Sequence, residues 1–469
     1  MGDALHCDVA IIGAGTAGLS AERAARRAGA KTLLIDPEFI GTTCANVGCM
    51  PSKLLIAAAR VAHAASTADV FGVRAAPTIN GAEVMARLRH ERDHFAGATR
   101  EEIEKLPDGI AVQSRARFVA EHSLMLSDGR TIEAKAVVVA TGSRPEIPST
   151  FEPISDLVLT NETIFELPEL PSTLAVVGAG PLGLELAQAM ARLGVDVTLL
   201  DKAGTLAGID DETIADRLKA ILAQDMRIAL GVEIAARTED GKAALQWKGA
   251  TAGNGLFDYV LVAAGRPPNL RDLDLKAAGL ELDNKGVPLF DRETMRCGTS
   301  AIYIAGDADA DRPVLHEASA EGAIAGTNAA RHPDGKPGRR CVPFSIMFTD
   351  PPLVLIGRRA GKGLLAGDTD YRQQGRARID GQAEGIARLF AEAGEGRLTG
   401  AVLLCPGADH LGHLLAWSIE SGATTKDLLD RPYYHPTLEE GLKRALRAIC
   451  KQIGLSAPET RDEGTPSGG

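Results

Sequence analysis

A chain of 469 residues, of which 45% are hydrophobic and 51 are glycine, is too long for one core and predicts about three domains. Its formal net charge of −11 would repel phosphate backbones, so nucleic acid is not an expected partner. No apolar stretch is long enough to span a membrane, and the start MGDALHCD lacks the basic residues of a secretory signal, which favours a cytoplasmic protein.

The first predicted elements form a strand, turn, helix and strand near the N-terminus. DVAIIGAGTAGLSAE contains an apolar strand, a glycine turn and an Ala-rich helix, and KTLLID is the next strand. Gly13 allows the tight turn, Gly15 lets the backbone approach a pyrophosphate, and Gly18 allows the helix to pack closely on the strand. Asp36 ends the second strand, where a carboxylate can accept a hydrogen bond from a ribose hydroxyl. The unit therefore predicts a dinucleotide site.

GTTCANVGCMPSK, residues 41–53, is the most specific segment of the chain. Two cysteines five positions apart on an ideal helix have Cα atoms roughly 8 to 9 Å apart, beyond the roughly 7 Å limit for a disulfide. We therefore expect Cys44 to lie outside regular helix, with Gly48 supplying flexibility and a helix beginning at Pro51. Because a helix N-terminus stabilises a thiolate, Cys44 and Cys49 are interpreted as a reducible redox pair. Two free buried thiols, or half of a metal site, are the alternatives.

The other five cysteines are dispersed, and we interpret them as buried or incidental thiols. The segment from His90 to His94 is a literal H-E-x-x-H, the pattern of a zinc site on a helix. Its neighbours Arg87, Arg89 and Arg92 are typical of a solvated helix, and no third ligand is evident. We predict no metal site.

The unit LAVVGAGPLGLELAQ followed by DVTLLD repeats the first unit without a gap. Gly178, Gly180 and Gly183 take the places of the three earlier glycines, and Asp201 that of the strand-end carboxylate. A carboxylate there repels a 2′-phosphate, so this second site is expected to prefer NAD(H) to NADP(H). Lys202 could instead meet a phosphate, although a solvated strand-end lysine is the interpretation we favour.

A second repeated pair consists of VVVATGSRP, residues 137–145, and VLVAAGRPPN, residues 260–269. Each is an apolar strand ending in a turn, and each is expected to close its own dinucleotide unit. Thr141, Gly142 and Gly265 in these turns are therefore candidate cofactor contacts. Segments rich in Pro, Gly and polar residues then mark crossings near residues 148–171 and 331–340.

These motifs together resemble the pyridine nucleotide-disulfide oxidoreductases, the group that contains dihydrolipoamide dehydrogenase, glutathione reductase and mercuric reductase. The resemblance covers roughly residues 7 to 455. It implies an α/β protein with two Rossmann-like domains, for FAD and NAD(H), plus a C-terminal α+β dimerisation domain, assembled as a homodimer. The expected ranges are 1–147 for the first part of the FAD domain, 148–268 for the NAD domain, 269–337 for the return to the FAD domain, 338–455 for the dimerisation domain and 456–469 for a disordered tail.

The resemblance also implies individual roles. Cys44 would exchange with the substrate and Cys49 would contact the flavin, the two being joined by a disulfide in the oxidised protein. Lys53 would bind near the flavin and pair with Glu185, and Asp307 would bind the ribityl chain.

The family base is a histidine in a His-Pro-Thr segment, supplied by the partner subunit and oriented by a glutamate five residues later. His435 and Glu440 match this spacing. The residues themselves offer a rival interpretation, because Thr437 and Glu440 form a T-x-x-E capping box at a helix start. Tyr433 and Tyr434 stand where lipoamide dehydrogenases have smaller residues, and they could narrow the channel that a lipoyl arm enters.

The expected function is oxidation of dihydrolipoamide, or of lipoyl groups on a carrier protein, with electrons passing from the cysteine pair through FAD to NAD+. A glutathione reductase-like activity is less favoured because of Asp201, and a mercuric reductase-like activity because Cys450 is solitary. A non-catalytic redox sensor that binds FAD and NAD is an alternative of another class. The complete set of cysteine, lysine, histidine and glutamate residues argues against it.

Overall fold

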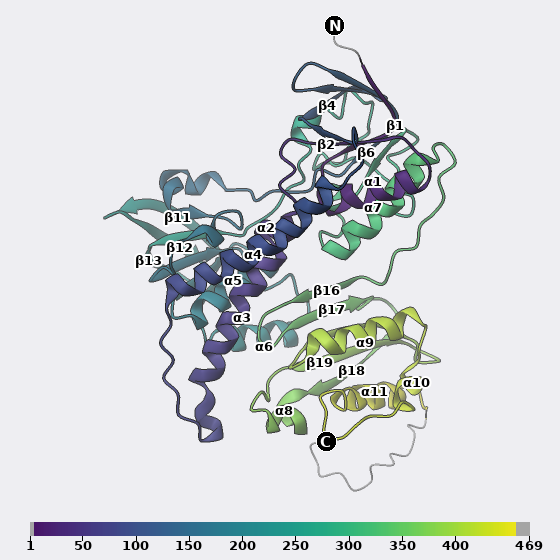
Figure 1. The fold of residues 1–469 in the computed structure, drawn as a ribbon. Helices are drawn as coiled ribbons and strands as arrows, with labels where there is room; N and C mark the ends of the chain where they lie inside the picture. The colour runs from purple at the N-terminus through teal and green to yellow at the C-terminus, as the bar shows by residue number, and fades with distance from the viewer. Residues whose placement is uncertain (1–3, 456–469) are drawn as a thin grey trace.

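A computed structural model describes residues 4–455 and shows a first lobe built on a mostly parallel sheet (Figure 1). Its elements are β1 (Leu5–Ile12), β2 (Thr32–Asp36), β3 (Ala111–Gln113), β4 (Ala116–Ala120), β5 (Ser123–Leu126), β6 (Thr131–Val139), β15 (Ile302–Ile304), α1 (Thr16–Arg27), α7 (Leu315–Ala330) and the short turns η4 (Arg271–Leu273) and η5 (Gly306–Asp309). The strand order is β3-β2-β1-β6-β5-β4, and β15 pairs with β6. Residues 9–12 of β1 are all buried, because α1 and α7 cover one face of the sheet and segment 270–302 covers the other.

The second lobe repeats this plan with a smaller parallel sheet in the order β10-β9-β8-β14-β7, beside an antiparallel sheet in the order β11-β12-β13. Its elements are η2 (Ser149–Leu157), β7 (Val158–Leu159), η3 (Ile164–Glu166), β8 (Thr173–Val177), α5 (Pro181–Arg192), β9 (Asp196–Asp201), α6 (Glu212–Leu222), β10 (Arg227–Leu230), β11 (Val232–Glu239), β12 (Lys242–Gly249), β13 (Gly253–Phe257) and β14 (Tyr259–Val262). Each lobe thus provides one strand, glycine turn and helix unit.

A pair of long helices connects the first two lobes (Figure 1). The segment consists of α2 (Thr43–Val47), α3 (Cys49–Ser66), η1 (Ala68–Phe71) and α4 (Gly81–Glu104). The buried face of α3, which includes Leu55, Ile56 and Ala59, belongs to the same apolar cluster as Leu186 and Met190 of α5. The cysteine segment is therefore anchored against the helix of the second glycine motif.

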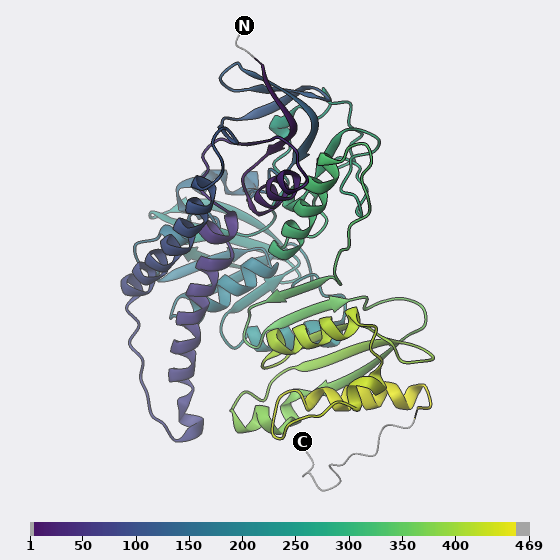
Figure 2. The ribbon, with the colours of Figure 1, turned by 45° about the vertical axis from the view of Figure 1, so that its right-hand side comes forward.

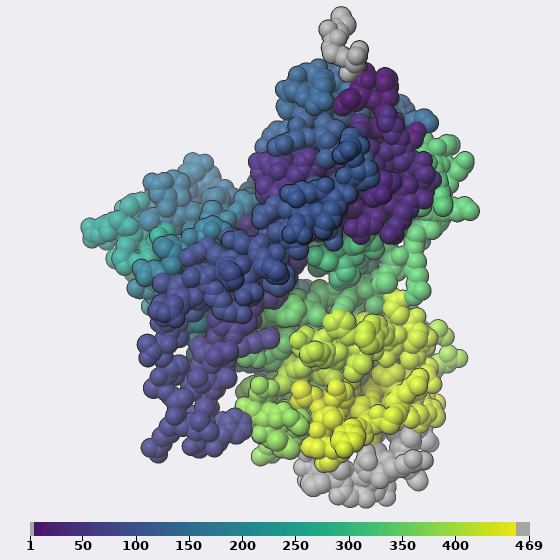
Figure 3. Space-filling view, viewed as in Figure 1, coloured from purple at the N-terminus to yellow at the C-terminus, as the bar shows by residue number. Residues whose placement is uncertain are grey.

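The third lobe is an antiparallel sheet in the order β16-β17-β20-β19-β18. Its elements are β16 (Phe344–Met347), β17 (Leu353–Gly357), β18 (Leu364–Asp370), η6 (Tyr371–Gln373), α8 (Gly375–Ile379), β19 (Ile386–Glu392), β20 (Leu398–Leu404), α9 (Ala408–Glu420), α10 (Thr425–Leu429) and α11 (Gly441–Gln452). One sheet face packs against α9 and α11, and the other contributes to the apolar cluster of the second lobe. The first and third lobes lie at opposite ends of the molecule (Figure 2), and the third forms a distinct green and yellow block on the surface (Figure 3).

The predicted fold class is confirmed: two dinucleotide-binding α/β units are followed by an α+β unit. The strands of each large sheet lie inside the ranges expected for one domain, with β15 returning to the first sheet. The domain boundaries themselves stay a prediction, and the expected tail at 456–469 lies outside the described residues. Between residues 4 and 455, no helix is both long and apolar enough to cross a bilayer.

Candidate active site

The two glycine turns have the same geometry. Gly13 and Gly178 have φ values of +105° and +115°, in the left-handed region that favours glycine. A Cβ atom at Gly18 would lie 1.8 Å from the carbonyl oxygen of Gly13, and one at Gly183 would lie 1.9 Å from that of Gly178. Side chains at these positions would therefore push each helix off its strand.

The helix that follows each turn begins with open backbone N–H groups. Gly15 and Gly180 are the N-cap residues of α1 and α5, and neither end has a side-chain cap. A Cβ atom at either glycine would meet no atom within 4 Å. Unsatisfied donors in open space at a helix N-terminus suit a pyrophosphate.

The strand-end carboxylates hold the two turns. Asp36 Oδ2 accepts a hydrogen bond from the backbone N–H of Ala14 at 2.9 Å, and Asp201 Oδ2 accepts one from the backbone N–H of Ala179. Because a carboxylate oxygen has more than one lone pair, the ribose hydroxyl contact expected from the sequence remains compatible with this role. Asp36 and Asp201 therefore stabilise each turn as well as being candidate ribose ligands.

The surroundings of Asp307 fit a flavin nucleotide. Among the described residues, the buried Thr141 Oγ1 and Asn269 Oδ1 have no hydrogen-bond partner. Asp307 Oδ2 accepts a hydrogen bond from Ser143 Oγ at 2.7 Å and lies 3.3 Å from a guanidinium nitrogen of Arg266. Buried polar atoms without partners cost free energy unless a ligand or water satisfies them. We expect these residues to hold FAD.

The two cysteines are brought together by a break between two helices. Cys44 lies within the short helix α2, so the expectation that it lies outside regular helix is wrong. The chain turns at Gly48, and α3 begins at Cys49 rather than at Pro51. A Cβ atom at Gly48 would lie 2.9 Å from the carbonyl oxygen of Thr43 and 3.1 Å from Cys44 Cα. Glycine is what lets the second helix start this close to the first.

Both cysteines are thiols in the structure, so the disulfide stays a prediction. A hydrogen bond from Cys44 and, with a smaller effect, the Lys53 ammonium together lower the pKa of Cys49 to about 6, against the opposing effect of burial. The same hydrogen bond, together with burial, raises the pKa of Cys44. At neutral pH the pair consists of a Cys44 thiol that donates to a Cys49 thiolate.

Lys53 and Glu185 form the ion pair expected between α3 and α5. The Lys53 ammonium lies 2.7 Å from Glu185 Oε2, and the Glu185 side chain is almost fully buried. Glu185 Oε1 accepts a hydrogen bond from the backbone N–H of Phe348 at 2.8 Å, and the Phe348 ring lies 4.6 Å from the ammonium. The pair is thus fixed by the first, second and third lobes together. No sequence signal singled out Phe348.

One cleft of about 470 Å³ joins these groups. Cys44, Cys49, Lys53 and Glu185 line it. Other residues that line it are Gly15, Gly142, Ser143, Arg266, Asp307, His316, Phe344, Phe348 and His413. The cysteines, the lysine and glutamate pair and Asp307 therefore open into a common space, whereas Thr141 and Asn269 do not line it. Gly265 is not among the lining residues; its carbonyl oxygen accepts a hydrogen bond from the backbone N–H of Glu146.

His435 and Glu440 contact each other as expected. His435 Nδ1 lies 3.0 Å from Glu440 Oε2, and Glu440 is buried while the His435 side chain is 53% exposed. Only half of the predicted capping box forms. Glu440 Oε2 accepts a hydrogen bond from the backbone N–H of Thr437 at 3.2 Å, but the Thr437 hydroxyl donates to the Tyr434 carbonyl oxygen at 2.8 Å, and α11 begins only at Gly441. His435 does not line the cysteine cleft of its own chain.

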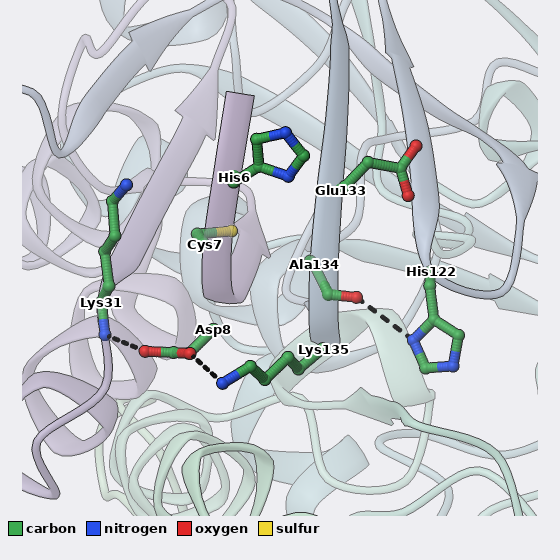
Figure 4. A pocket seen from close by; sticks show the side chains of 8 residues that line it. All are labelled: His6, Cys7, Asp8, Lys31, His122, Glu133, Ala134 and Lys135. Atoms are coloured by element: carbon green, nitrogen blue, oxygen red, sulfur yellow. Dashed lines mark hydrogen bonds and ion pairs between the residues drawn. The ribbon is translucent and has the colours of Figure 1, made fainter. Parts of the chain in front are cut away.

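A second hollow, of about 590 Å³, lies near the amino ends of β1 and β6, around Cys7 (Figure 4). Within it, Asp8 accepts from the backbone N–H of Lys31 at 2.7 Å and binds Lys135 at 2.8 Å. Burial raises the pKa of Cys7 to about 12, so this thiol stays protonated. The hollow therefore offers no thiolate.

The H-E-x-x-H segment lies within α4, where Arg92 forms ion pairs with Asp93 and Glu166, both at 2.6 Å. No group of three or more His, Cys, Asp or Glu side chains between residues 4 and 455 is arranged to hold a metal ion.

Comparisons with known proteins agree with this geometry. Residues 7–323 match the pyridine nucleotide-disulphide oxidoreductase family, and residues 345–446 match the dimerisation domain of that family. The chain belongs to this family. It is 33% identical to dihydrolipoyl dehydrogenase of Haloferax volcanii, across 93% of this chain and 95% of the relative, and 33% identical to dihydrolipoyl dehydrogenase of Bacillus subtilis, across 96% and 99%.

Other members of the family have different names. Mercuric reductase of Acidithiobacillus ferrooxidans is 32% identical, across 96% of this chain and 84% of that protein. The structure is similar to the Cu(II) complex of the HOCl-induced flavoprotein disulfide reductase RclA from Escherichia coli, with a TM-score of 0.81, 22% identity and coverage of 94% and 99%. This family comprises FAD- and NAD(P)-dependent disulfide oxidoreductases, and the dimerisation domain supports a homodimer. The substrate is a separate question.

Proposed function

We propose that this flavoprotein disulfide oxidoreductase is a dihydrolipoyl dehydrogenase that oxidises dihydrolipoyl groups with NAD+. The observation that carries the proposal is the Cys44 thiol hydrogen-bonded to a Cys49 with a lowered pKa, in the cleft that Lys53 and Glu185 also line. The two relatives at 33% identity that bear this name support it.

Cys44 and Cys49 have different roles in the proposed thiol exchange. In the oxidised protein a substrate thiolate attacks Cys44 Sγ, the Cys44–Cys49 disulfide breaks, and Cys49 leaves as a thiolate. A low pKa makes Cys49 the better leaving group. The second substrate thiol, once deprotonated, attacks the substrate sulfur bound to Cys44, which closes the substrate disulfide and leaves Cys44 reduced. FAD, held by the residues around Asp307, would supply the two-electron acceptor, and NAD+ would be the final hydride acceptor.

Two further groups serve this chemistry. His435, delivered by the partner subunit, accepts the thiol proton, and Glu440 holds its Nδ1 so that Nε2 faces the substrate. Lys53, held by Glu185, lowers the pKa of Cys49 and keeps it a thiolate.

Nucleotide selection is assigned to Asp201, whose anionic carboxylate at the end of β9 repels a 2′-phosphate. NAD+ is therefore the expected acceptor. The lipoyl carrier protein and the cytoplasmic location expected from the sequence are parts of this proposal.

Steady-state kinetics of the purified holoenzyme test the proposal. We expect reduction of NAD+ with dihydrolipoamide to have a kcat/KM at least about 100-fold higher than reduction of glutathione disulfide, because the family specialises its disulfide site by differential transition-state binding. NADPH should be a poorer cofactor than NADH in the reverse direction. Efficient NADPH oxidation driven by Hg(II) would instead favour a mercuric reductase, and FAD binding without turnover of any dithiol would favour a redox sensor.

A further inference from the structure

Lys443 is a buried cation at an unfavourable place in the fold. It is the third residue of α11, in the first turn, where the partial positive charge of the helix N-terminus opposes a lysine. Its side chain is only 10% exposed. Lysine is almost never buried to this extent unless it is paired. This position therefore calls for an explanation beyond packing, because the neighbouring buried positions Leu442 and Leu446 carry apolar side chains.

The contacts of Lys443 lead to the candidate base. Its ammonium lies 3.3 Å from Glu440 Oε1, while Glu440 Oε2 is 3.0 Å from His435 Nδ1. Its ammonium also lies 5.3 Å from the centre of the Tyr433 ring, within cation–π range. One buried carboxylate thus contacts an imidazole through Oε2, which also accepts from the Thr437 backbone N–H at 3.2 Å, and an ammonium through Oε1.

We infer that Lys443 is a positioning residue that shares the Glu440 carboxylate with His435 and thereby sets how strongly this carboxylate stabilises the protonated imidazole. The inference rests on the proposed role of His435 as the base. A carboxylate that already faces an ammonium offers less stabilisation to a second cation. Lys443 thus competes with a protonated His435 for the negative charge of Glu440.

Other charged and titratable groups also lie around this turn. Glu439 and Arg447 act on Tyr433, and burial raises the pKa of Tyr433 to about 12, so its ring stays neutral. The buried Tyr371 donates a hydrogen bond to the Leu438 carbonyl oxygen at 3.0 Å, and its pKa is raised by burial. Both phenols are uncharged near neutral pH and leave Lys443 as the cation that contacts Glu440.

The test compares Lys443→Met with the conservative Lys443→Arg and with Lys451→Met, an exposed lysine in the last turn of the same helix. We expect Lys443→Met to move the acid limb of the pH profile for dihydrolipoamide oxidation up by about one pH unit, with little change in kcat on the alkaline plateau. Lys443→Arg should keep the limb within about 0.3 units of wild type, and Lys451→Met should not move it.

A second readout separates this inference from the proposed substrate. Carbethoxylation of His435 by diethyl pyrocarbonate requires a neutral imidazole, and peptide mass spectrometry follows it at each pH without any dithiol. We expect its midpoint to move in Lys443→Met by the same amount as the acid limb. If both midpoints stay in place while the melting temperature falls, Lys443 is only structural and the inference is wrong. If carbethoxylation shifts but no dithiol is oxidised, the inference stands and the proposed function fails.

Discussion

The difference in pKa between Cys44 and Cys49 arises mainly from the hydrogen bond between them. Cys44 is half-buried and Cys49 is exposed, and loss of hydration alone would raise the pKa of each thiol. The Cys44 thiol donates to Cys49, and the Lys53 ammonium lowers the pKa of Cys49 as well, so the negative charge settles on Cys49. Cys49, the residue expected to contact the flavin, is therefore the one that carries the negative charge.

Removal of this donor should be measurable. We expect Cys44→Ala to raise the pKa of Cys49 above the value of about 6 by about one unit or more, because the thiolate loses its hydrogen bond. Thiolate absorbance at 240 nm, titrated in the reduced protein, measures this change. Cys341→Ala, which removes an exposed cysteine elsewhere, is the control and should leave the titration of Cys49 unchanged. An unchanged midpoint in Cys44→Ala would show that the hydrogen bond contributes nothing.

Asp309, two residues after Asp307, has a buried carboxyl group. Burial, and then the neighbouring Glu321 carboxylate, raise the pKa of Asp309 from its ordinary 3.8 to about 8. The folded protein therefore holds this proton more tightly than the unfolded chain does. The stability that it contributes is complete below about pH 4 and is lost progressively as the pH rises to about 8.

We therefore expect the melting temperature of Asp309→Asn to rise relative to that of wild type as the pH increases from 5 to about 8, because the asparagine amide never ionises. Thermal unfolding at several pH values measures the difference. Asp291→Asn is the matched control: hydrogen bonds from Thr294 lower the pKa of Asp291, so its effect should be flat over this range. If the difference in melting temperature between Asp309→Asn and wild type does not change with pH, the Asp309 carboxyl is ionised in the folded protein.

At the scale of elements, the break between α2 and α3 is what makes a redox pair out of cysteines five positions apart. A continuous helix would separate their Cα atoms by roughly 8 to 9 Å. The turn at Gly48 starts a second helix against the first, where a Cβ atom would lie 2.9 Å from a backbone oxygen. The helix dipole of α3 then begins at Cys49 itself.

We expect Gly48→Ala to destabilise the protein by about 1 to 3 kcal/mol, since backbone must move to admit the methyl group. It should also separate the two sulfurs and slow dithiol oxidation more than it slows reduction of ferricyanide by NADH, which does not use the pair. Gly97→Ala is the control: Gly97 lies inside α4 with nothing within 4 Å of an added Cβ atom, and the change should stabilise by about 0.5 to 1 kcal/mol. Denaturant unfolding gives both values, and equal effects of the two substitutions would contradict this explanation.

Within one chain, the candidate base lies apart from the cysteines. Cys44 and Cys49 open into a cleft that residues of all three lobes line, whereas His435 precedes α11 on another part of the third lobe and does not line that cleft. A base exposed to solvent cannot serve cysteines that it does not reach. The dimerisation domain that contains His435 supports its delivery from a second subunit.

A hybrid dimer tests this delivery. Cys44→Ser and His435→Gln subunits with two different tags are coexpressed, and the mixed dimer is purified. We expect each variant homodimer to be nearly inactive in dihydrolipoamide oxidation, and the hybrid to have about half of the wild-type activity, since one of its two symmetric sites is intact. An inactive hybrid would place His435 in the site of its own chain.

Features that depend on local geometry or on repetition could be predicted from the sequence. Two copies of a glycine turn predicted two dinucleotide units, because only glycine tolerates φ values near those of Gly13 and Gly178 beside a packed helix. The spacing of the cysteines required a departure from one continuous helix, and resemblance to a family supplied the pairs Lys53 with Glu185 and His435 with Glu440.

Features that need contacts between distant segments came from the tertiary structure alone. The sequence predicted Cys44 outside regular helix with flexibility at Gly48, whereas the structure keeps Cys44 in the short helix α2 and confines the turn to Gly48. Of the expected capping box only the bond from the Thr437 backbone N–H to Glu440 forms, because the Thr437 hydroxyl donates to the Tyr434 carbonyl oxygen. Phe348 beside the Lys53 and Glu185 pair, and Lys443 beneath Glu440, bear no motif. Their importance comes from burial, where the free energy of an ion pair depends on every neighbouring charge, and a linear sequence does not specify those neighbours.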